Sequence, residues 1–255
     1  MDRREAHRQA CGRADDCVRH GRVLVVGVGG LGAPAAWHLA AAGVGTVGLI
    51  DGDAVELSNL HRQIIYRTAD VGRRKVTAAA ERIASRYPAV RLPCFDESLS
   101  ERNLRDVFRG FDFVIDGTDR IETKYLVNDG AALCGLPFSH AGIVGFHGQT
   151  MTVVPSHSAC LRCLFPSPPP AGDVPTCQET GVIGALAGTI GIVQATEALK
   201  FLLGSGTLLA DRLLTYDALT MGWRTVGLSR NPACPLCGPQ PTIRSLESVT
   251  PRACK

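Results

Sequence analysis

Four cysteines occur as two closely spaced pairs in the second half of the chain. Cys160 and Cys163 form one C-x-x-C pair, and Cys234 and Cys237 form the other. Two thiolates at this spacing can reach one ion from a single tight turn, so two pairs can supply a tetrahedral structural zinc site. A thioredoxin-like redox pair is the alternative, but it lacks the following helix and leaves the other pair unexplained. The spacing therefore predicts a Cys₄ zinc site.

A glycine-rich turn follows a short apolar run near the start of the chain. Gly27, Gly29 and Gly32 have the G-x-G-x-x-G spacing, after the β-branched residues 23–26 and before the helix formers 33–42. Glycine lets a backbone approach a phosphate closely, and a helix N-terminus presents free N–H groups to it. This order predicts a nucleotide site, although the motif does not distinguish a dinucleotide from a mononucleotide.

Polar side chains follow at positions where they could bind the rest of a nucleotide. Asp51 lies nineteen residues beyond Gly32, where an acidic residue usually accepts hydrogen bonds from ribose hydroxyls. Asn59, Arg62 and Lys75 could converge on phosphates beyond the glycine turn. Taken one at a time, each of these three is better explained as a solvated surface residue.

Two aspartates come at the end of another predicted strand, residues 111–115. Ligands of parallel sheets bind at the carboxyl ends of strands, and a carboxylate there can hold Mg²⁺. Asp116 and Asp119 stand at this place in the sequence. Asp119 could equally cap the helix expected from Ile121, so both interpretations stay open on spacing alone.

Cys177 lies in a long segment, 155–181, that contains six prolines. Segments of this length without regular structure are usually functional or disordered. A lone cysteine there could be a nucleophile or a persulfide carrier. Most lone cysteines are inert, however, and no neighbouring His or Lys shows how the pKa of this thiol would fall.

The order of apolar runs predicts the fold class. Strands and helices alternate between residues 23 and 141, which predicts an α/β fold with a doubly wound, Rossmann-like, mostly parallel sheet. From residue 148 the pattern changes to antiparallel strands, with a long apolar helix over 180–203 that must be buried against the sheet or a second subunit. Some residues are expected in structural roles: Cys94 and Cys134 in the core, and His140 and His147 as structural or surface histidines.

Composition excludes several function classes. The 255 residues carry 27 basic and 24 acidic side chains, a balance that gives no case for nucleic-acid binding. No stretch reaches 18 uninterrupted apolar residues, so no membrane span is expected, and the charged first twenty residues lack the apolar core of a secretory signal. Ten cysteines then favour metal ligands or reactive thiols over disulfides, and a cytoplasmic location is expected.

Together these motifs resemble the ThiF/MoeB/HesA family, bacterial relatives of ubiquitin-activating enzymes. The resemblance covers residues 21–238 and rests on motifs that occur in order: the glycine turn 27–32, Asp-Gly-Asp at 51–53, Ser-Asn-Leu-His-Arg-Gln at 58–63, Lys75, Asp-Gly-Thr-Asp at 116–119, the two cysteine pairs, and Thr-Cys at 176–177. We accordingly expect an N-terminal arm, 1–20, an adenylation domain, 21–238, whose crossover loop 155–181 is tied by zinc, and a loose tail, 239–255.

The resemblance implies a specific reaction. Members of this family use ATP and Mg²⁺ to adenylate the C-terminal glycine of a small ubiquitin-like sulfur-carrier protein ending in Gly-Gly. By motif, Asp51 would hold the ribose, Asn59, Arg62 and Lys75 would bind the triphosphate, and Asp119 would serve Mg²⁺ and the acyl-adenylate chemistry. The motifs also assign further residues to the ATP site, namely Gly27, Gly29, Gly30, Gly32, Asp53 and Gln63, and make Cys177 a catalytic candidate.

Two positions depart from the family pattern. An arginine before the first strand usually reaches the ATP of the partner subunit, and here the nearest candidate is Arg8, in different surroundings. The usual Thr-Asp-Asn is replaced by Thr118-Asp119-Arg120, so a cation follows the aspartate. The resemblance further implies a homodimer. Because no rhodanese-like domain follows the second cysteine pair, a separate sulfur donor is expected.

Two other functions compete with adenylation. A non-catalytic scaffold would keep the nucleotide fold without turnover, although the retained polar residues of the ATP motifs argue against it. An NAD-dependent oxidoreductase would explain the glycine turn and Asp51. It would explain neither the basic residues nor the cysteine pairs.

Overall fold

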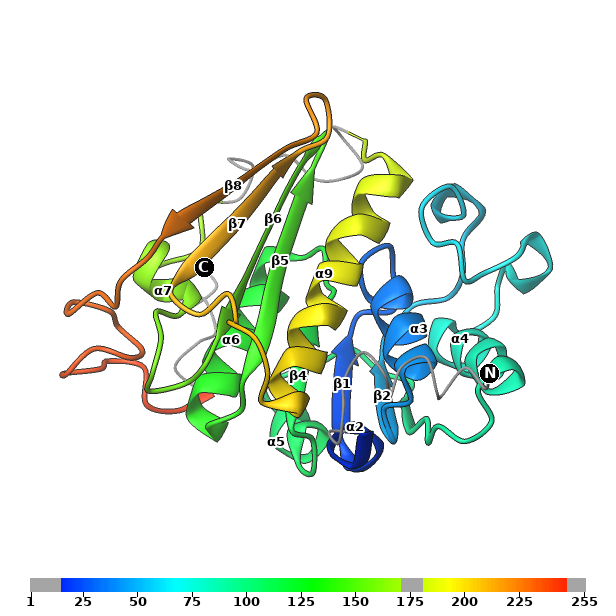
Figure 1. Cartoon of the computed structure of the whole chain (residues 1–255), viewed down its shortest axis with the longest axis horizontal. Coiled ribbons are helices and arrows are strands. Elements are labelled where there is room, and N and C mark those ends of the chain that lie inside the picture. The colour runs from blue at the N-terminus through cyan, green and yellow to red at the C-terminus, as the bar shows by residue number, and fades with distance from the viewer. Residues whose placement is uncertain (1–14, 171–180, 247–255) are drawn as a thin grey trace, which may run out of the picture.

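The computed structural model describes residues 15–170 and 181–246, and its centre is one eight-stranded sheet in the order β3-β2-β1-β4-β5-β6-β7-β8 (Figure 1). The strands are β1 (Arg22–Val26), β2 (Thr46–Ile50), β3 (Cys94–Phe95), β4 (Phe113–Asp116), β5 (Phe138–Val144), β6 (His147–Val153), β7 (Arg212–Asp217) and β8 (Gly222–Gly227). The first five pair in parallel, and β5 to β8 pair in antiparallel fashion. The predicted fold class is confirmed.

Helices cover both faces of this sheet. They are α2 (Asp15–His20), α3 (Gly32–Ala42), α4 (Lys75–Arg86), α5 (Leu104–Phe108), α6 (Ile121–Cys134), α7 (Leu161–Leu164) and α9 (Gly184–Leu203), with 3₁₀ turns η2 (Leu57–Asn59) and η3 (Thr68–Asp70). The helices α3, α4 and α9 lie on one face, and α5 and α6 lie on the other (Figure 1).

The alternation of side chains along each strand builds two hydrophobic cores. In β1, Val23 and Val25 point to the core under α3, α4 and α9, whereas Leu24 and Val26 point to the core under α5 and α6. A parallel strand covered on both faces therefore has no polar side, which explains the uninterrupted apolar run in the sequence. The second core also contains Cys160 from the first cysteine pair.

Local contacts set the boundaries of several elements. Strand β5 extends to Val144 because its outer half pairs with β6 rather than with β4. Helix α5 begins at Leu104, because Ser100 and Asn103 exchange backbone-to-side-chain hydrogen bonds of 2.8 and 3.4 Å in the turn that precedes it. The edge strand β3 has two residues, Cys94 and Phe95.

The prediction that Cys94 and Cys134 lie in the core is wrong. Both are exposed: Cys94 lies on the edge strand β3, and Cys134 is the last residue of α6. An edge strand and a helix end each leave side chains to solvent, which an apolar neighbourhood in the sequence does not reveal. The described part of the predicted tail includes Leu246, which is buried in the second core.

Helix α9 is the one described helix whose length and apolar composition would allow it to cross a membrane. In the structure it packs on α3 and on β4, β5 and β6 (Figure 1), and Leu186, Ile190 and Ala195 are buried. The core helix of a folded domain meets the same length and composition criteria. The predicted burial of this helix against the sheet is confirmed.

Candidate active site

The glycine turn lies at the carboxyl edge of the sheet, between β1 and α3. Gly27 has a φ of +82°, and a Cβ on Gly32 would lie 1.8 Å from the Gly27 carbonyl oxygen, so neither position accepts a side chain. A Cβ on Gly29 would have the Gln63 amide as its nearest neighbour, at 3.5 Å. Gly29 therefore has room beside its backbone, as a phosphate-binding turn requires.

Asp51 stands at the end of β2 and contacts the same turn. Its carboxylate accepts the N–H groups of Val28, at 2.7 Å, and Asp53, at 2.9 Å. Burial raises the pKa of Asp51, and the charge of Lys75 together with these two N–H groups opposes that rise. Each carboxylate oxygen can accept more than one hydrogen bond, so Asp51 can still accept hydrogen bonds from ribose hydroxyls.

Lys75 begins α4 and points back to the end of β2. Its ammonium lies 2.8 Å from Asp53 and 3.9 Å from Asp51, and its side chain is 7% exposed. A buried cation needs such partners. Asn59 and Arg62 contact each other instead, through a 2.8 Å hydrogen bond from the guanidinium to the Asn59 amide oxygen. The predicted phosphate-binding residues thus form two groups: Lys75 with the aspartates, and Asn59 with Arg62.

The loop that carries Asn59 and Arg62 is fixed by contacts that the sequence analysis missed. The buried Tyr66 hydroxyl donates to the Val28 carbonyl at 2.7 Å, which anchors the loop to the glycine turn. On its other side the loop meets the start of α9, where a Cβ on Gly184 would lie 2.4 Å from the His61 carbonyl oxygen. A tyrosine seven residues after Asn59 carries no local signal for this contact.

Gln63 has an unused acceptor beside the glycine turn. Its side chain is buried, and its Oε1 atom has no hydrogen-bond partner among the described residues. A buried amide oxygen without a donor is unfavourable, so a donor from a ligand or an ordered water would stabilise it. The position beside Gly29 fits the predicted ATP site.

Asp119 is exposed, and the alternative that it caps α6 is wrong. Arg120 occupies the N-cap position of that helix, with no side-chain capping bond. Within residues 15–170 and 181–246, Asp119 forms no hydrogen bond or ion pair, so its carboxylate is free for a ligand. The nearby Asp116 is the aspartate that the fold uses internally.

Asp116 is fully buried at the end of β4. Its carboxylate contacts Lys124 at 3.3 Å, His140 at 2.9 Å and the Thr118 hydroxyl at 2.6 Å. Burial opposes ionisation, but these three partners outweigh it and hold the pKa of Asp116 at about 2. His140 is therefore a buried structural histidine and the His147 side chain is 70% exposed, both as predicted.

We expect Asp116 to make the protein acid-sensitive. Its pKa of about 2 in the folded state lies below the ordinary 3.8, so its stabilisation is present above pH 3.8 and is lost as the pH falls toward 2. The loss should be about 2 kcal/mol in the free energy of unfolding, measured by urea denaturation at each pH. In Asp116→Asn the free energy of unfolding should not show this loss as the pH falls. The control Asp106→Asn, at an exposed aspartate, should still show it. If the free energy of unfolding of Asp116→Asn depended on pH as that of the wild type does, Asp116 would not be the source of the acid sensitivity.

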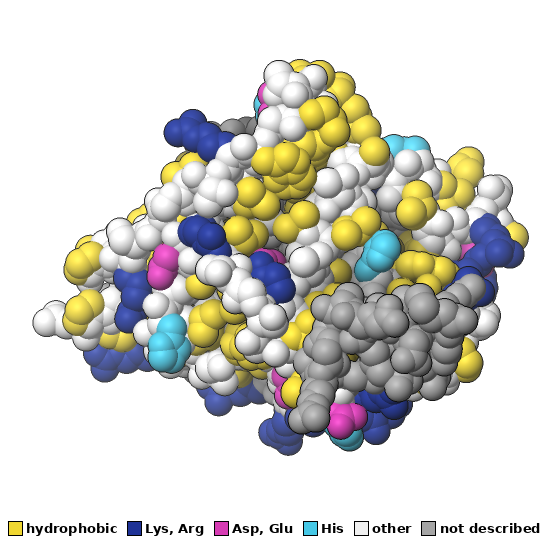
Figure 2. Space-filling view, in the orientation of Figure 1, with side chains coloured by type: hydrophobic (Ala, Val, Ile, Leu, Met, Phe, Trp, Pro, Cys, Tyr) yellow, Lys and Arg dark blue, Asp and Glu magenta, His cyan; other side chains and the backbone are white. Residues whose placement is uncertain are grey.

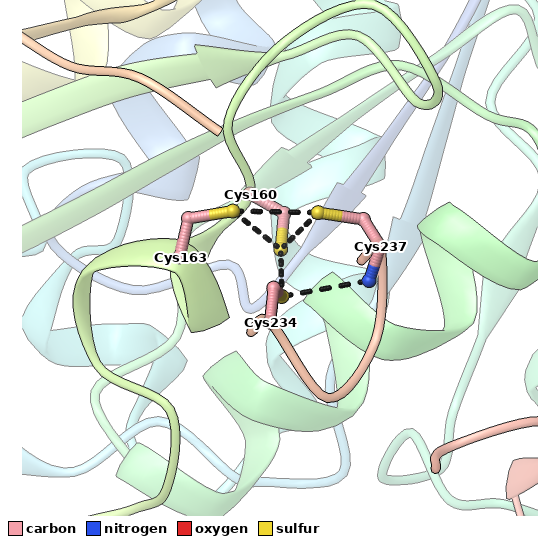
Figure 3. A group of neighbouring side chains, drawn as sticks. All are labelled: Cys160, Cys163, Cys234 and Cys237. Carbon is pink, nitrogen blue, oxygen red and sulfur yellow. Dashed lines mark hydrogen bonds between the residues drawn. The ribbon is translucent and has the colours of Figure 1, made fainter. Parts of the chain in front are cut away.

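The four paired cysteines converge in the second core (Figure 3). Their sulfur atoms are separated by 3.3 to 3.9 Å in the four closest pairs, near the about 3.8 Å edge of a tetrahedron around Zn²⁺. Without an ion, burial and the neighbouring thiols raise the pKa of Cys160, and burial raises that of Cys237 to about 11. A divalent cation reverses this tendency, so the site fits zinc.

Buried polar groups of α6 hold the first cysteine pair in place. Arg162, between Cys160 and Cys163, makes two 2.7 Å hydrogen bonds to the buried Asp129 carboxylate. Asn128 accepts the backbone N–H of Leu161 at 2.9 Å. The charged residue inside the cysteine pair and the Asn-Asp sequence in the apolar second half of α6 are the signals in the sequence for this contact.

Comparison with known proteins assigns the family. The model of the ThiF family matches residues 3–236 of this chain. The chain belongs to the ThiF family. A sulfur carrier protein adenylyltransferase from Thermus thermophilus is 46% identical to it over 234 residues, which are 90% of this chain and 86% of the relative. The SAMP-activating enzyme E1 of Haloferax volcanii is 45% identical over 228 residues, 89% of this chain and 84% of the relative.

A solved structure supports the same fold. Escherichia coli MccB with ATP superimposes on this ThiF-family chain with a TM-score of 0.79, at 20% identity, over 88% of this chain and 68% of that chain. The resemblance drawn from the motifs is confirmed at the level of the family. Of the ThiF-family residues predicted from sequence, Arg8 and Cys177 lie outside the described residues.

Proposed function

We propose that this protein uses ATP to adenylate the C-terminal glycine of a small ubiquitin-like sulfur-carrier protein that ends in Gly-Gly. One observation carries the proposal: the glycine turn, the Asp51–Lys75 pair and Asp119, which has no partner among the described residues, lie at the carboxyl ends of β1, β2 and β4. Ligands of doubly wound sheets bind at this edge. The identity of 46% to a sulfur carrier protein adenylyltransferase supports the choice of substrate.

The proposed reaction needs positioning more than acid–base chemistry. A C-terminal carboxylate is ionised near neutral pH, so its oxygen can attack the α-phosphorus without a general base. The acyl–phosphate bond forms as the bond to pyrophosphate breaks, and Arg62 and Lys75 offset the charge on that leaving group. Asp51 would orient the ribose. Asp119 would hold Mg²⁺, which supplies further charge compensation at the phosphates.

The same proposal includes a structural Zn²⁺ at Cys160, Cys163, Cys234 and Cys237. The four thiols would join the segment that follows β6 to the loop that follows β8. Arg230 supports this junction, because its guanidinium donates to the Ser156 carbonyl at 3.0 Å and to the Cys237 carbonyl at 2.6 Å. A closed set of four cysteine ligands leaves no open position for catalysis, so the role of the metal is structural.

We further propose that the protein is a homodimer through the outer face of α9. Ile183 and Ile192 are exposed there, and a Cβ on Gly188 would meet no atom within 4 Å among the described residues. Hydrophobic side chains also gather at the tip of the β7–β8 hairpin in the same view (Figure 2), where Met221 and Trp223 are exposed. A second copy of this chain would remove these apolar surfaces from water.

The dimer proposal predicts that Ile192→Glu gives a monomer. A buried, unpaired carboxylate at the interface is expected to weaken association by about a hundredfold or more. Light scattering after size-exclusion chromatography over a dilution series measures this. The matched variant Ser85→Glu, on the exposed side of α4, should remain dimeric. A wild-type chain that is monomeric at all concentrations would contradict the proposal.

Cys177 is proposed to act after adenylation: its thiolate would attack the acyl carbon of the carrier adenylate, so that a thioester to the carrier forms as the bond to AMP breaks. Adenylation is assigned to the residues of the ATP motifs, so Cys177→Ala should keep ATP–pyrophosphate exchange within about twofold of wild type. The variant should lose any reductant-sensitive covalent link to the carrier, seen on non-reducing gels and by intact mass. A link that persists in Cys177→Ala, or unchanged sulfur transfer, would contradict this role.

The cytoplasm is the proposed compartment. The seven described cysteines are all free of disulfides, which is typical of proteins in a reducing environment.

ATP–pyrophosphate exchange with and without carrier tests the proposed function. A panel of Gly-Gly-ending sulfur carriers, including the one activated by the Thermus thermophilus relative, should support exchange with at least one member. Removal of the last glycine from that carrier should abolish the exchange. Tight ATP binding without exchange for every carrier would favour the scaffold alternative.

A further inference from the structure

A buried polar cluster lies where β4 and β5 separate. The two strands pair over two residues, and β5 then continues beside β6. Side chains from helices on both faces of the sheet donate hydrogen bonds to backbone carbonyl groups where the two strands separate. Gln194 of α9 donates to the carbonyls of Asp116 and Ser139 at 2.9 and 3.0 Å, and Lys124 of α6 donates to that of Ala141 at 2.6 Å. The opening at this sheet edge is thus held by specific hydrogen bonds.

The charges of the cluster fix the protonation of His140. Asp116 is ionised, with a pKa of about 2, and burial lowers the pKa of His140 in spite of this carboxylate. The imidazole is therefore neutral at neutral pH. Because its Nδ1 atom lies 2.9 Å from an ionised carboxylate oxygen, the proton is on Nδ1 and is donated to Asp116. The Lys124 ammonium balances the charge of Asp116.

The same carboxylate holds the turn that leads to Asp119. Its Oδ1 atom accepts the backbone N–H of Thr118 at 3.1 Å and the Thr118 hydroxyl at 2.6 Å. Gly117 packs against the glycine turn, since a Cβ there would lie 2.8 Å from the Gly27 carbonyl oxygen. The Asp119 side chain makes no hydrogen bond or ion pair with the described residues, so the backbone of this turn determines where its carboxylate lies.

We propose that His140 is a positioning residue for Asp119. Its donated hydrogen bond orients the Asp116 carboxylate, which holds the Thr118 turn and thereby directs Asp119 toward the bound nucleotide. The His140 side chain is 5% exposed, so it acts through Asp116 and not on the substrate. This inference rests on the proposed adenylation and adds a residue whose role the motifs do not assign.

Two substitutions distinguish the hydrogen-bond donor of His140 from the volume of its side chain. The Nδ2 atom of His140→Asn can take the place of Nδ1 and keep the donor, whereas His140→Leu fills the space without one. We expect His140→Leu to lower kcat of ATP–pyrophosphate exchange about tenfold, with KM for ATP within about twofold of wild type. His140→Asn should restore kcat to within about twofold of wild type. The control His38→Leu, an exposed histidine on α3, should leave both constants unchanged.

Backbone hydrogen exchange of residues 113–120 gives a readout that does not depend on turnover. The Thr118 amide should exchange faster in His140→Leu than in wild type, and at the wild-type rate in His140→Asn. If no carrier supports turnover, the adenylation proposal fails and this comparison still decides the role of His140. Equal losses in the Leu and Asn variants, or wild-type amide exchange in His140→Leu, would overturn the inference.

Discussion

Asp119→Ala is expected to abolish carrier adenylation while the protein stays folded. The carboxylate is exposed and makes no hydrogen bond or ion pair with the described residues, so its removal costs the fold nothing that the structure shows. In the proposed reaction it holds the cation that offsets charge on the phosphates. Loss of such electrostatic stabilisation should lower ATP–pyrophosphate exchange by about a thousandfold.

The matched control for Asp119 is another exposed aspartate. Asp106→Ala, on α5 at the opposite edge of the sheet, should keep wild-type exchange and wild-type thermal stability. Asp119→Asn keeps the size of the side chain and removes its charge, and should be nearly as inactive as Asp119→Ala. A folded Asp119→Ala protein with full exchange activity would show that this carboxylate has no catalytic role.

Cys163→Ser should remove the bound zinc and strongly destabilise the chain. Structural zinc sites contribute on the order of 10 kcal/mol to folding in small domains, which is comparable with the whole stability of an average protein. We expect one zinc per wild-type chain by elemental analysis, and a Tm lowered by at least about 10 °C in Cys163→Ser. The loss of stability is expected because the zinc site links two segments of the second core.

Cys134→Ser is the control for the zinc prediction. Cys134 is a free and exposed cysteine at the end of α6, outside the four-cysteine cluster. Its substitution should leave both the zinc content and the Tm unchanged. A Cys163→Ser protein that retains one zinc per chain, or a wild-type protein without zinc whose four thiols titrate freely, would contradict the assignment.

The features that sequence predicted best are local or repeated. The strand, glycine turn and helix around Gly27 follow one another directly, so their residue types alone determine the unit. The two cysteine pairs carry their spacing in the sequence, and the structure brings all four sulfur atoms within 4.8 Å of one another. Asp51 was located by its distance from the turn, because that distance is the length of one helix and one strand.

The features that sequence did not predict depend on contacts between distant elements. Arg162 pairs with Asp129, thirty-three residues away, and Tyr66 bonds Val28 across thirty-eight residues. Neither pair has a fixed spacing that a motif could express. Whether Asp119 is free for a ligand or caps α6 was also undecidable from spacing, because the helix begins one residue later than such a cap requires, with Arg120 at the N-cap position.

The transfer of AMP from ATP to the carrier tests the central claim most directly. ATP labelled at the α-phosphate is incubated with the protein, Mg²⁺ and a Gly-Gly-ending sulfur carrier, and the label on the carrier is compared with the pyrophosphate released. The account predicts that the label on the carrier and the label in AMP released by transfer to Cys177 together equal the pyrophosphate. It predicts no labelled product and no pyrophosphate with Asp119→Ala or with a carrier that lacks its last glycine. ATP binding without label on any carrier, or release of ADP and phosphate in place of pyrophosphate, would contradict it.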